Sequence, residues 1–472
     1  MKKLLSIYIL FGVFILNAQK KNVLLIIVDD LRADLNEFSD KGVHKPAIDK
    51  LSSEGVSFTR AYCQKALCVP SRQSFLTGMR PNKFGAGFNE HFRKKLPKHI
   101  TLPQYFKENG YQSISLGKVF HHRDPVSWTE PSWVPQPKYY YPIYGTEEAV
   151  KIQQEQVKAK QFFPKDKEWW ARGDKWVPGL IWESPDVLDN KLTDGMLTDY
   201  AIEKIDELKN KPFFMAVGFF RPHLPFIAPK KYFDLYPLNS IRLSKNETLP
   251  KGSPGISAQT GGEWRHYHKI PSTGMPKEDT RKEYIRAYLA SVSYVDAQIG
   301  RLLKKLNDSG LEENTVVVLL SDHGYHLFDK NSFGKSTNFE DAVKVHLTLR
   351  DKSTQKARKT SAIIELIDLY PTICELVNLP VPQFLDGKSF KDVIKGSDTG
   401  KELAYSQYFR SGFQGVSIRT DRFRYTQWKK GKQILEELYD FSLADPEGKN
   451  LIQETEYRKH SFTLKQKLKA GF

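Results

Sequence analysis

Runs of consecutive apolar residues alternate with amphipathic stretches along most of the chain. Asn22–Val28, 212–218 and 315–320 are apolar at nearly every position, which is typical of strands buried on both faces of a parallel sheet. Shorter strands are predicted at 56–61 and 111–116. Helical spacing of apolar residues predicts helices over 48–55, 73–79, 102–109, 188–209, 281–306 and 361–377. We therefore expect an α/β fold with a large mixed, mainly parallel sheet sandwiched by helices.

The pattern changes near residue 402. Short apolar segments separated by turn residues predict a smaller C-terminal antiparallel sheet with a terminal helix, and they lie at 405–409, 415–419, 423–428 and 437–440. We place the boundary after residue 380. Residues 19–380 would then form an N-terminal α/β domain, and residues 381–472 a C-terminal α+β subdomain.

Two stretches interrupt the α/β pattern. Residues from about 124 to 185 are rich in Trp, Tyr, Pro and Lys, which indicates a long insertion over the ligand-binding face rather than a separate domain. Its aromatic rings would either stack on sugars or pack against the body. The second stretch, 250–277, predicts a loop whose cluster 264–269 could bind an anionic sugar.

The N-terminus carries an export pattern. A basic start at Lys2 and Lys3 precedes the apolar run 4–16, which is too short to span a membrane comfortably, and Ala18 follows. This predicts a signal peptide over residues 1–18 and a periplasmic or secreted protein; an uncleaved N-terminal anchor is the alternative. No later run has the length of a membrane span, so we expect none.

Charge and cysteine content narrow the partners. The formal net charge of +17 favours polyanions. Nucleic acid is disfavoured because the basic residues are spread along the chain without a binding motif, whereas a sulfated polysaccharide fits both charge and compartment. The three cysteines, Cys63, Cys68 and Cys374, provide no disulfide framework.

Polar residues follow the predicted parallel strands. Asp29 and Asp30 end the first strand, and Asp322 and His323 follow the strand 315–320. Ligands gather at the carboxyl ends of such strands, and adjacent carboxylates repel each other unless a cation joins them, which indicates a divalent metal. One capping and one solvated aspartate is the alternative.

Further polar residues follow two other strands. Lys118 and His121 come after the strand 111–116, and His223 comes after the strand 212–218. Prolines on either side of the histidine indicate a stiff, extended segment, which suits a fixed imidazole.

The segment 68–72, Cys-Val-Pro-Ser-Arg, precedes an apolar helical run. Its proline predicts a helix that starts at or just after Cys68, where free backbone N–H groups, the helix dipole and Arg72 would attract an anion. A buried structural thiol and a nucleophilic thiolate are both consistent with this position. The pattern Cys-x-Pro-Ser-Arg, however, resembles the sulfatase signature.

From about residue 22 to residue 451, the chain resembles the arylsulfatase-like enzymes of the alkaline-phosphatase superfamily. The resemblance includes the segments 25–31, 68–78, 103–121, 212–226 and 321–324. It implies that Cys68 is oxidised to Cα-formylglycine by a formylglycine-generating enzyme. It also implies one divalent ion, with Ca²⁺ favoured over Mg²⁺, whose ligands would be Asp29, Asp30, Cys68, Asp322 and His323.

The same resemblance implies catalytic roles for six positions. Cys68 would supply the hydrated aldehyde, Arg72 would hold this hydrate, and Lys118 and Lys335 would bracket the sulfate. His223 would protonate the leaving sugar oxygen. His121 would take a proton when sulfate is expelled.

We therefore expect hydrolysis of sulfate esters in a sulfated polysaccharide or its oligosaccharides, with the sulfate on a uronate or a hexose. Asn89, His91 and Arg93 follow the Cys68 helix and are predicted to contact the substrate. A phosphate-monoester or phosphonate hydrolase on the same fold is one alternative. A polyanion-binding protein with a silent site is the other.

Overall fold

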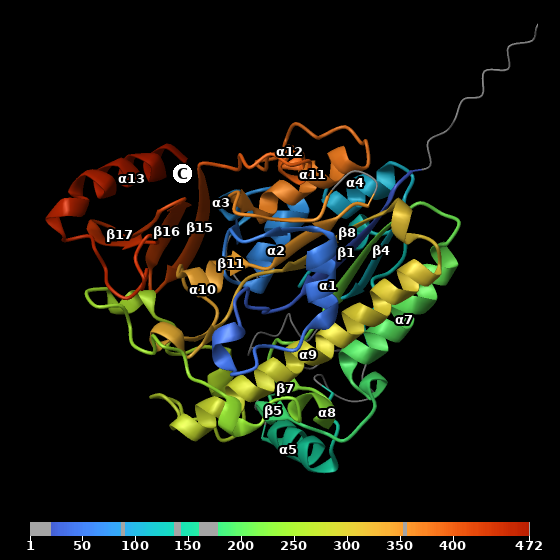
Figure 1. Cartoon of the computed structure of the whole chain (residues 1–472), viewed down its shortest axis with the longest axis horizontal. Coiled ribbons are helices and arrows are strands. Elements are labelled where there is room, and N and C mark those ends of the chain that lie inside the picture. The colour runs from blue at the N-terminus through green and yellow to red at the C-terminus, as the bar shows by residue number, and fades with distance from the viewer. Residues whose placement is uncertain (1–19, 86–89, 136–142, 160–177, 353–355, 472) are drawn as a thin grey trace, which may run out of the picture.

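The computed structural model describes residues 20–85, 90–135, 143–159, 178–352 and 356–471. A central sheet, the helices that cover it and a separate C-terminal sheet make up most of this part of the chain (Figure 1). The predicted signal peptide lies outside the described residues, and so does Asn89. None of the described helices is long and apolar enough to cross a membrane.

The central sheet has seven strands, and four neighbouring strands in it run parallel. Strand β1 pairs in parallel with β6 and β8, and β4 pairs in parallel with β6, whereas β12 is antiparallel to both of its neighbours. The order across the sheet is β13 (Arg358–Thr360), β2 (Val56–Phe58), β12 (Leu347–Arg350), β8 (Thr315–Ser321), β1 (Asn22–Val28), β6 (Phe213–Phe219) and β4 (Gln112–Gly117). The predicted mixed, mainly parallel sheet is confirmed.

Both faces of the sheet are buried, which explains the continuous apolar runs. In β1, Leu24 and Ile26 belong to one hydrophobic core and Leu25 and Ile27 to the other, because side chains alternate across a strand. Helices α1 (Pro46–Glu54), α7 (Thr193–Leu208) and α9 (Glu278–Asp308) pack on the first face, and Figure 1 shows α7 alongside α9. Helices α2 (Cys68–Thr77), α4 (Leu102–Glu108) and α11 (Leu369–Leu376) pack on the second.

The C-terminal sheet has the predicted antiparallel form. Its strands follow one another in chain order as β15 (Leu403–Arg410), β16 (Phe413–Thr420), β17 (Phe423–Lys430) and β18 (Gln433–Asp440). Helix α13 (Arg458–Gly471) packs on it through Leu464 and Leu468, which share a small core with Ile418 and Tyr425 (Figure 1). The subdomain boundary at residue 380 stays a prediction.

Short elements connect these units. The strands are β3 (Ala61–Tyr62), β5 (Trp182–Glu183), β7 (Phe226–Ile227), β9 (His326–Leu327), β10 (Phe333–Gly334), β11 (Lys344–Val345) and β14 (Ile364–Glu365). The helices are α3 (Pro81–Phe84), α5 (Glu147–Lys158), α8 (Lys230–Phe233), α10 (Glu340–Val343) and α12 (Lys391–Ile394).

Two predicted helices begin later than expected. The helix expected at 361–377 starts only at Leu369, because Ile364 and Glu365 pair with β3 as strand β14. The helix expected at 188–209 starts at Thr193, after a 3₁₀ turn over Asp189–Lys191. Tertiary strand pairing and a local turn therefore override the apolar periodicity at these two starts.

The described tryptophans of the insertion pack against the protein. Trp128 is buried, and the Trp133 ring stacks on Tyr200 with ring centroids 4.1 Å apart. Trp182 lies against Phe233. These contacts support the packing interpretation for the described part of the insertion; Trp169, Trp170 and Trp176 lie outside the described residues.

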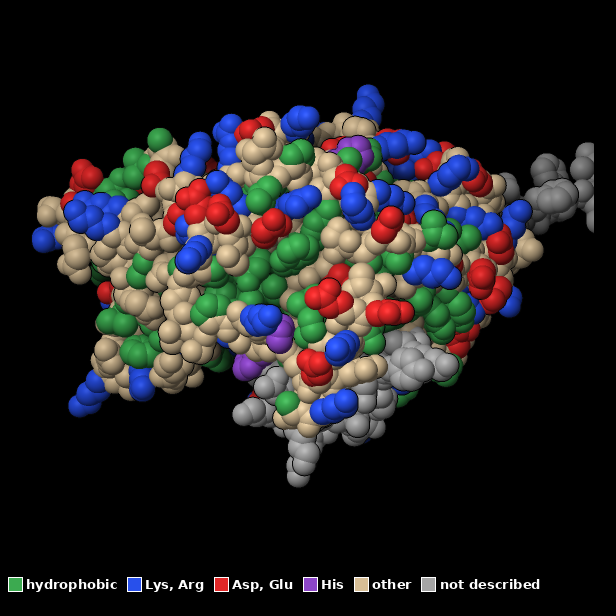
Figure 2. Space-filling view, turned by 90° about the horizontal axis from the view of Figure 1, so that it is seen from below, with side chains coloured by type: hydrophobic (Ala, Val, Ile, Leu, Met, Phe, Trp, Pro, Cys, Tyr) green, Lys and Arg blue, Asp and Glu red, His purple; other side chains and the backbone are tan. Residues whose placement is uncertain are grey.

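The basic residues do not form one stripe on the face seen in Figure 2. Lys and Arg side chains are interspersed there with Asp and Glu side chains. The basic residues on this face are therefore dispersed among acidic ones, as expected from their spread along the chain.

Candidate active site

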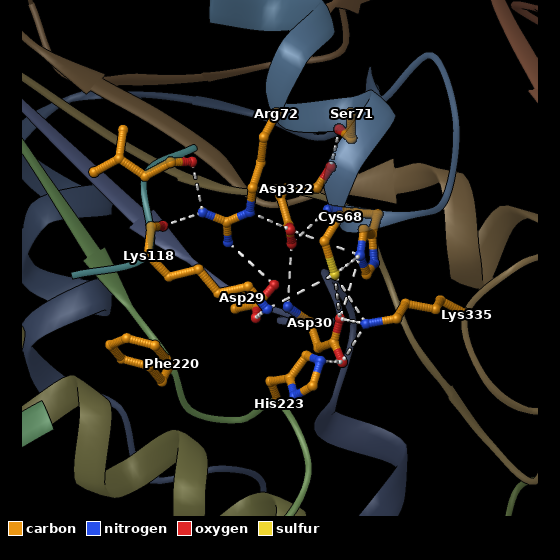
Figure 3. Close-up of polar contacts among 12 residues, drawn as sticks. Asp29, Asp30, Cys68, Ser71, Arg72, Lys118, Phe220, His223, Asp322 and Lys335 are labelled. Carbon is orange, nitrogen blue, oxygen red and sulfur yellow. Dashed lines mark hydrogen bonds and ion pairs between the residues drawn. The ribbon is translucent and has the colours of Figure 1, made fainter. Parts of the chain in front are cut away.

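Four parallel strand ends and one helix N-terminus meet at the site shown in Figure 3. Strands β8, β1, β6 and β4 are neighbours, so their carboxyl ends lie along one edge of the sheet. They lead into the polar residues Asp322 and His323, Asp29 and Asp30, His223, and Lys118, respectively. Helix α2 presents its first residue, Cys68, to the same point.

Cys68 is buried beside two lysines and a histidine. Its Sγ atom lies 3.0 Å from Lys335 Nζ, 3.3 Å from His323 Nε2 and 4.0 Å from Lys118 Nζ. Burial, and next to it the Asp29 charge, raises the pKa of the Cys68 thiol well above its ordinary value. The unmodified side chain is therefore a neutral thiol, which does not favour the thiolate interpretation.

The paired carboxylates are matched by separate cations. Asp29 forms ion pairs with Lys118 and with Arg72, whereas both oxygens of Asp30 accept hydrogen bonds from Lys335, at 2.8 and 3.0 Å. Burial favours the neutral acids, but these cations outweigh it and lower the pKa of both carboxyls. The site therefore holds two ionised carboxylates side by side.

Asp30 adopts a left-handed backbone conformation, with φ of 61°. Its N–H donates to Asp322 Oδ1 at 3.1 Å, and its carbonyl oxygen accepts from the Tyr288 hydroxyl at 2.7 Å. Non-glycine residues rarely adopt this conformation, and such strain gathers at functional sites. These two bonds hold the Asp30 backbone in this conformation, and Lys335 bonds its carboxylate.

Arg72 braces the carboxylates rather than Cys68. Its Nε donates to Asp322 Oδ2 at 2.8 Å and its Nη2 to Asp29 Oδ1 at 3.1 Å, and its Nη1 bonds the carbonyl oxygens of Lys118 and Val119. Ser71 Oγ donates to the Asp322 carbonyl oxygen at 2.5 Å. Helix α2 is thus fastened to the ends of β1, β4 and β8 (Figure 3).

The donor set fits a divalent cation. One ligand atom from each of Asp29, Asp30, Cys68 and His323 lies within 4.8 Å of the others, and all four residues are buried. Asp322 Oδ2 is 3.7 Å from His323 Nε2. Two carboxylates and one imidazole converge there beside residue 68, and the neighbouring Asp322 offers a third carboxylate, which suits a hard ion with mainly oxygen ligands. The geometry does not distinguish Ca²⁺ from Mg²⁺.

A second cluster contains His326, Asp329 and Asp341. Arg32 forms ion pairs with both of these aspartates, and Lys330 forms one with Asp341. These ion pairs form a buried network that joins the end of β1 to the β9–β10 region.

His223 faces the carboxylates from the segment after β6. Its Nδ1 lies 2.7 Å from the Leu224 carbonyl oxygen, which can only accept, so we assign the neutral ring's proton to Nδ1. Its Nε2 lies 3.9 Å from Asp30 Oδ2 and 3.5 Å from Glu263 Oε2. Burial, together with Lys118 and Lys335, lowers the pKa of His223 to about 3.

The structure places two further residues beside this segment that the sequence did not single out. Glu263 comes from the loop 250–277, in which the sequence-based prediction concerned the aromatic and basic cluster 264–269. Asp194 in α7 accepts hydrogen bonds from the N–H groups of Phe220, at 2.8 Å, and Arg221, at 2.9 Å. Burial raises the pKa of Asp194 to about 6. A single buried aspartate in a helix gives no distinctive sequence signal.

The remaining predicted residues lie around β4. The His121 ring packs against His122 with centroids 5.2 Å apart, and burial followed by the Lys118 charge lowers the pKa of His121 well below its ordinary value. His91 Nδ1 accepts from the Arg93 N–H. The Arg93 guanidinium bonds Asp124, Gln104 and two carbonyl oxygens. These bonds hold Arg93 in the protein, so its predicted substrate contact would require their rearrangement.

Comparison with known proteins identifies the family. The family model described as Sulfatase matches residues 21–379. The chain belongs to the sulfatase family. A model described as N-sulphoglucosamine sulphohydrolase, C-terminal, matches residues 324–471 of this sulfatase. The protein is therefore a sulfuric ester hydrolase, as its resemblance to the family predicted.

Two relatives of this sulfatase share about a third of its residues. Iduronate 2-sulfatase of Mus musculus is 32% identical over 486 residues, covering 86% of this chain and 84% of the relative. A sulfatase of Formosa agariphila is 32% identical over 447 residues, covering 90% and 82%.

Solved structures confirm the fold. One, described in complex with its substrate D-glucosamine-2-N,6-O-disulfate, aligns with a TM-score of 0.74 at 22% identity, covering 96% of this chain and 97% of the other. The phosphonate monoester hydrolase of Silicibacter pomeroyi aligns with a TM-score of 0.71 at 21% identity, covering 96% and 95%. The fold is thus shared with enzymes that act on different anionic esters.

Proposed function

We propose that this sulfatase is an exported, formylglycine-dependent enzyme that removes sulfate from a sulfated polysaccharide or its oligosaccharides. The observation that carries the proposal is the position of Cys68 at the N-terminus of α2, between Lys118 and Lys335 and beside the buried carboxylates. Export rests on the predicted signal peptide 1–18. The basic net charge agrees with a polyanionic substrate.

Sulfate recognition follows from the cations. Lys118 and Lys335 approach Cys68 Sγ to 4.0 and 3.0 Å, and the N-terminus of α2, which has no side-chain cap, begins at the same residue. Together they surround the position that a sulfate would occupy on attack by the residue 68 side chain. Cations placed there stabilise negative charge that develops on the sulfate oxygens.

The metal ion and the modified side chain of residue 68 would be held by residues already described. We favour Ca²⁺ over Mg²⁺ as the divalent ion. It would be held by Asp29, Asp30, Asp322, His323 and the side chain derived from Cys68. The ion and the formylglycine hydrate would supply an activated hydroxyl that attacks sulfur. Arg72 orients two of the carboxylate ligands through its bonds to Asp29 and Asp322.

The histidines supply proton transfer. Because His223 Nδ1 is directed to the Leu224 carbonyl oxygen, its Nε2 is the nitrogen available to the leaving oxygen. The negative charge of a bound sulfate opposes the Lys118 and Lys335 charges and so favours the protonated imidazole. His121, beside Lys118, would accept a proton as sulfate leaves. The overall reaction yields the alcohol and hydrogen sulfate from the ester and one water.

Peptide mass spectrometry and sulfate release test this function together. The protein is produced with and without a formylglycine-generating enzyme, and Cys63 and Cys374 serve as unmodified thiol controls in the same digest. We expect a loss of about 18 Da at Cys68, and sulfate release from sulfated glycans that disappears in Cys68→Ala. An unmodified Cys68 together with no release from any glycan would favour a polyanion-binding protein.

The shared fold calls for a second substrate class in this test. Phosphate and phosphonate monoesters are assayed beside the sulfates, because a phosphonate monoester hydrolase has the same fold. If the enzyme hydrolyses those monoesters faster than the sulfates, sulfate-ester hydrolysis is not its main activity.

A further inference from the structure

The loop 250–277 contributes an acid to the site. The Trp264 ring is buried against Phe333, with centroids 5.1 Å apart, and the Arg265 guanidinium donates to the carbonyl oxygens of Thr260, Pro271 and Gly274. Arg265 is thus bonded within its own loop, which does not support the expected binding of an anionic sugar by this arginine. Glu263, directly before Trp264, lies beside His223 instead.

Glu263 can be reached by a ligand. Its side chain is 18% exposed, and its Oε2 lies 3.5 Å from His223 Nε2. Its Oε1 is buried without a hydrogen-bond partner among the described residues. While His223 is neutral with its proton on Nδ1, neither Glu263 oxygen accepts a hydrogen bond from the described residues, so both are available to a substrate donor.

The position of Glu263 is fixed by the strand that leads to Lys335. The Phe333 N–H donates to the Gln259 carbonyl oxygen at 3.1 Å, and the Gln259 N–H donates to Ser332 Oγ at 2.8 Å. Lys335 follows β10 (Phe333–Gly334) directly. Together with the buried Trp264, these bonds hold the acid at a set distance from the sulfate-binding lysine.

This geometry places Glu263 next to the leaving group. The leaving oxygen would sit at hydrogen-bond distance from His223 Nε2, about 3 Å. A substituent on the adjacent carbon lies about 3 Å from that oxygen, within reach of the Glu263 carboxylate, which accepts hydrogen bonds and repels anions. The group that Glu263 meets is therefore the vicinal substituent.

We propose that Glu263 is a specificity-determining residue that favours substrates with a hydroxyl or ammonium group vicinal to the sulfate ester and disfavours a carboxylate or second sulfate there. The proposal rests on the proposed sulfatase function. It narrows the substrate class to sugars in which the carbon next to the sulfate ester carries a hydrogen-bond donor and no second sulfate.

Aryl sulfates test this without knowledge of the sugar. The probes are 2-hydroxyphenyl and 2-carboxyphenyl sulfate, with the 4-substituted isomers as controls that place the same groups out of reach. Burial raises the pKa of Glu263 to about 7, so kcat/KM is measured at pH 8, where the carboxylate is ionised. Glu278→Gln, which removes an acid paired with Lys282 at the start of α9, is the matched variant.

We divide kcat/KM for 2-carboxyphenyl sulfate by kcat/KM for 2-hydroxyphenyl sulfate. In Glu263→Gln we expect this ratio to rise about tenfold over wild type, because the repulsion of the carboxylate is removed. The corresponding ratio for the 4-substituted isomers should stay unchanged. Where aryl turnover is slow, the same ratio is taken from competition against the sugar sulfate that the enzyme hydrolyses. An unchanged 2-isomer ratio in an active Glu263→Gln enzyme overturns the proposal. If the wild-type enzyme releases sulfate from none of the substrates, the sulfatase function itself is overturned.

Discussion

Lys335 Nζ lies 3.0 Å from Cys68 Sγ and 2.8 Å from Asp30 Oδ1, so one ammonium group contacts both the proposed nucleophile precursor and a proposed metal ligand. Burial opposes its charge, but the neighbouring carboxylates, Asp30 foremost, outweigh burial and raise the pKa of Lys335. The charge is therefore retained at every pH at which the enzyme is assayed.

Lys335→Met should lower kcat on sulfate esters by about 10²–10³-fold, because a preorganised cation at the sulfate oxygens is lost. Steady-state kinetics on the modified enzyme measure this, and the mass of the residue 68 peptide verifies modification. Lys344→Met, which removes a lysine paired with the exposed Asp34, should stay within about twofold. Equal losses in both variants would argue against a sulfate-binding role.

Removal of the divalent ion should abolish activity and lower the melting temperature, because the buried carboxylates lose their common cation. Ligand binding stabilises a fold by about 2.7 kcal/mol at a free concentration 100 times Kd. Thermal unfolding after chelation, with and without added Ca²⁺ or Mg²⁺, measures the shift. His323→Ala should eliminate it, whereas His326→Ala, from the second cluster, should keep it; a shift retained in His323→Ala would contradict the ligand assignment.

Asp194→Asn should reduce kcat on the order of 10–100-fold through misplacement of the segment that carries His223. The amide has one oxygen acceptor for two backbone donors, Phe220 and Arg221, so one N–H is left unsatisfied at a cost of about 1–3 kcal/mol. Kinetics and denaturant unfolding measure both effects. Asp199→Asn, on the same helix but partly exposed and paired with Arg301, is the control. Wild-type kcat in Asp194→Asn would refute a positioning role.

The ion pairs that Glu340 forms with the C-terminal sheet should weaken at acid pH, which should lower the free energy of unfolding. Burial opposes ionisation of this carboxyl, but Arg424 in β17 and Arg419 in β16 outweigh it and lower its pKa to about 2 from 4.5. A lowered pKa means that the ionised form stabilises the fold. This contribution is fully present above pH 4.5 and is lost as the pH falls through about 2.

Glu340→Gln should therefore reduce the free energy of unfolding by up to about 3 kcal/mol at pH 7, and the difference from wild type should shrink between pH 4.5 and 2. Denaturant unfolding at several pH values measures it, with Glu278→Gln as an exposed control. A difference that does not vary with pH would exclude the ion pairs as its source.

The strand ends of the site could be predicted because both faces of the sheet are buried. Continuous apolar runs mark β1 and β8, and the polar pairs after them, Asp29 with Asp30 and Asp322 with His323, stand out for that reason. Pro70 indicated the start of α2 for an equally local reason. The metal-binding and Cys68 predictions thus depended on patterns within a few residues.

Glu263 and Asp194 could not be predicted in this way. Glu263 is brought to His223 by hydrogen bonds between its loop and the Ser332–Phe333 segment, and Asp194 acts on backbone groups of a strand end elsewhere in the chain. The late start of α11 has the same origin, because the pairing of Ile364 with β3 is a long-range contact. Long-range contacts leave no periodic signal.

Every residue of α2 is buried, and Cys68 itself is 1% exposed. On the proposed function, this sets an order of events during biogenesis. A modifying enzyme would have to reach the Cys68 thiol, whereas the finished fold encloses it against the strand ends. If Cys68 is oxidised as proposed, oxidation would have to precede closure of the central sheet, and the rate of folding would limit the time available for activation. Protein that folds first is a stable population that later contact with the modifying enzyme cannot activate.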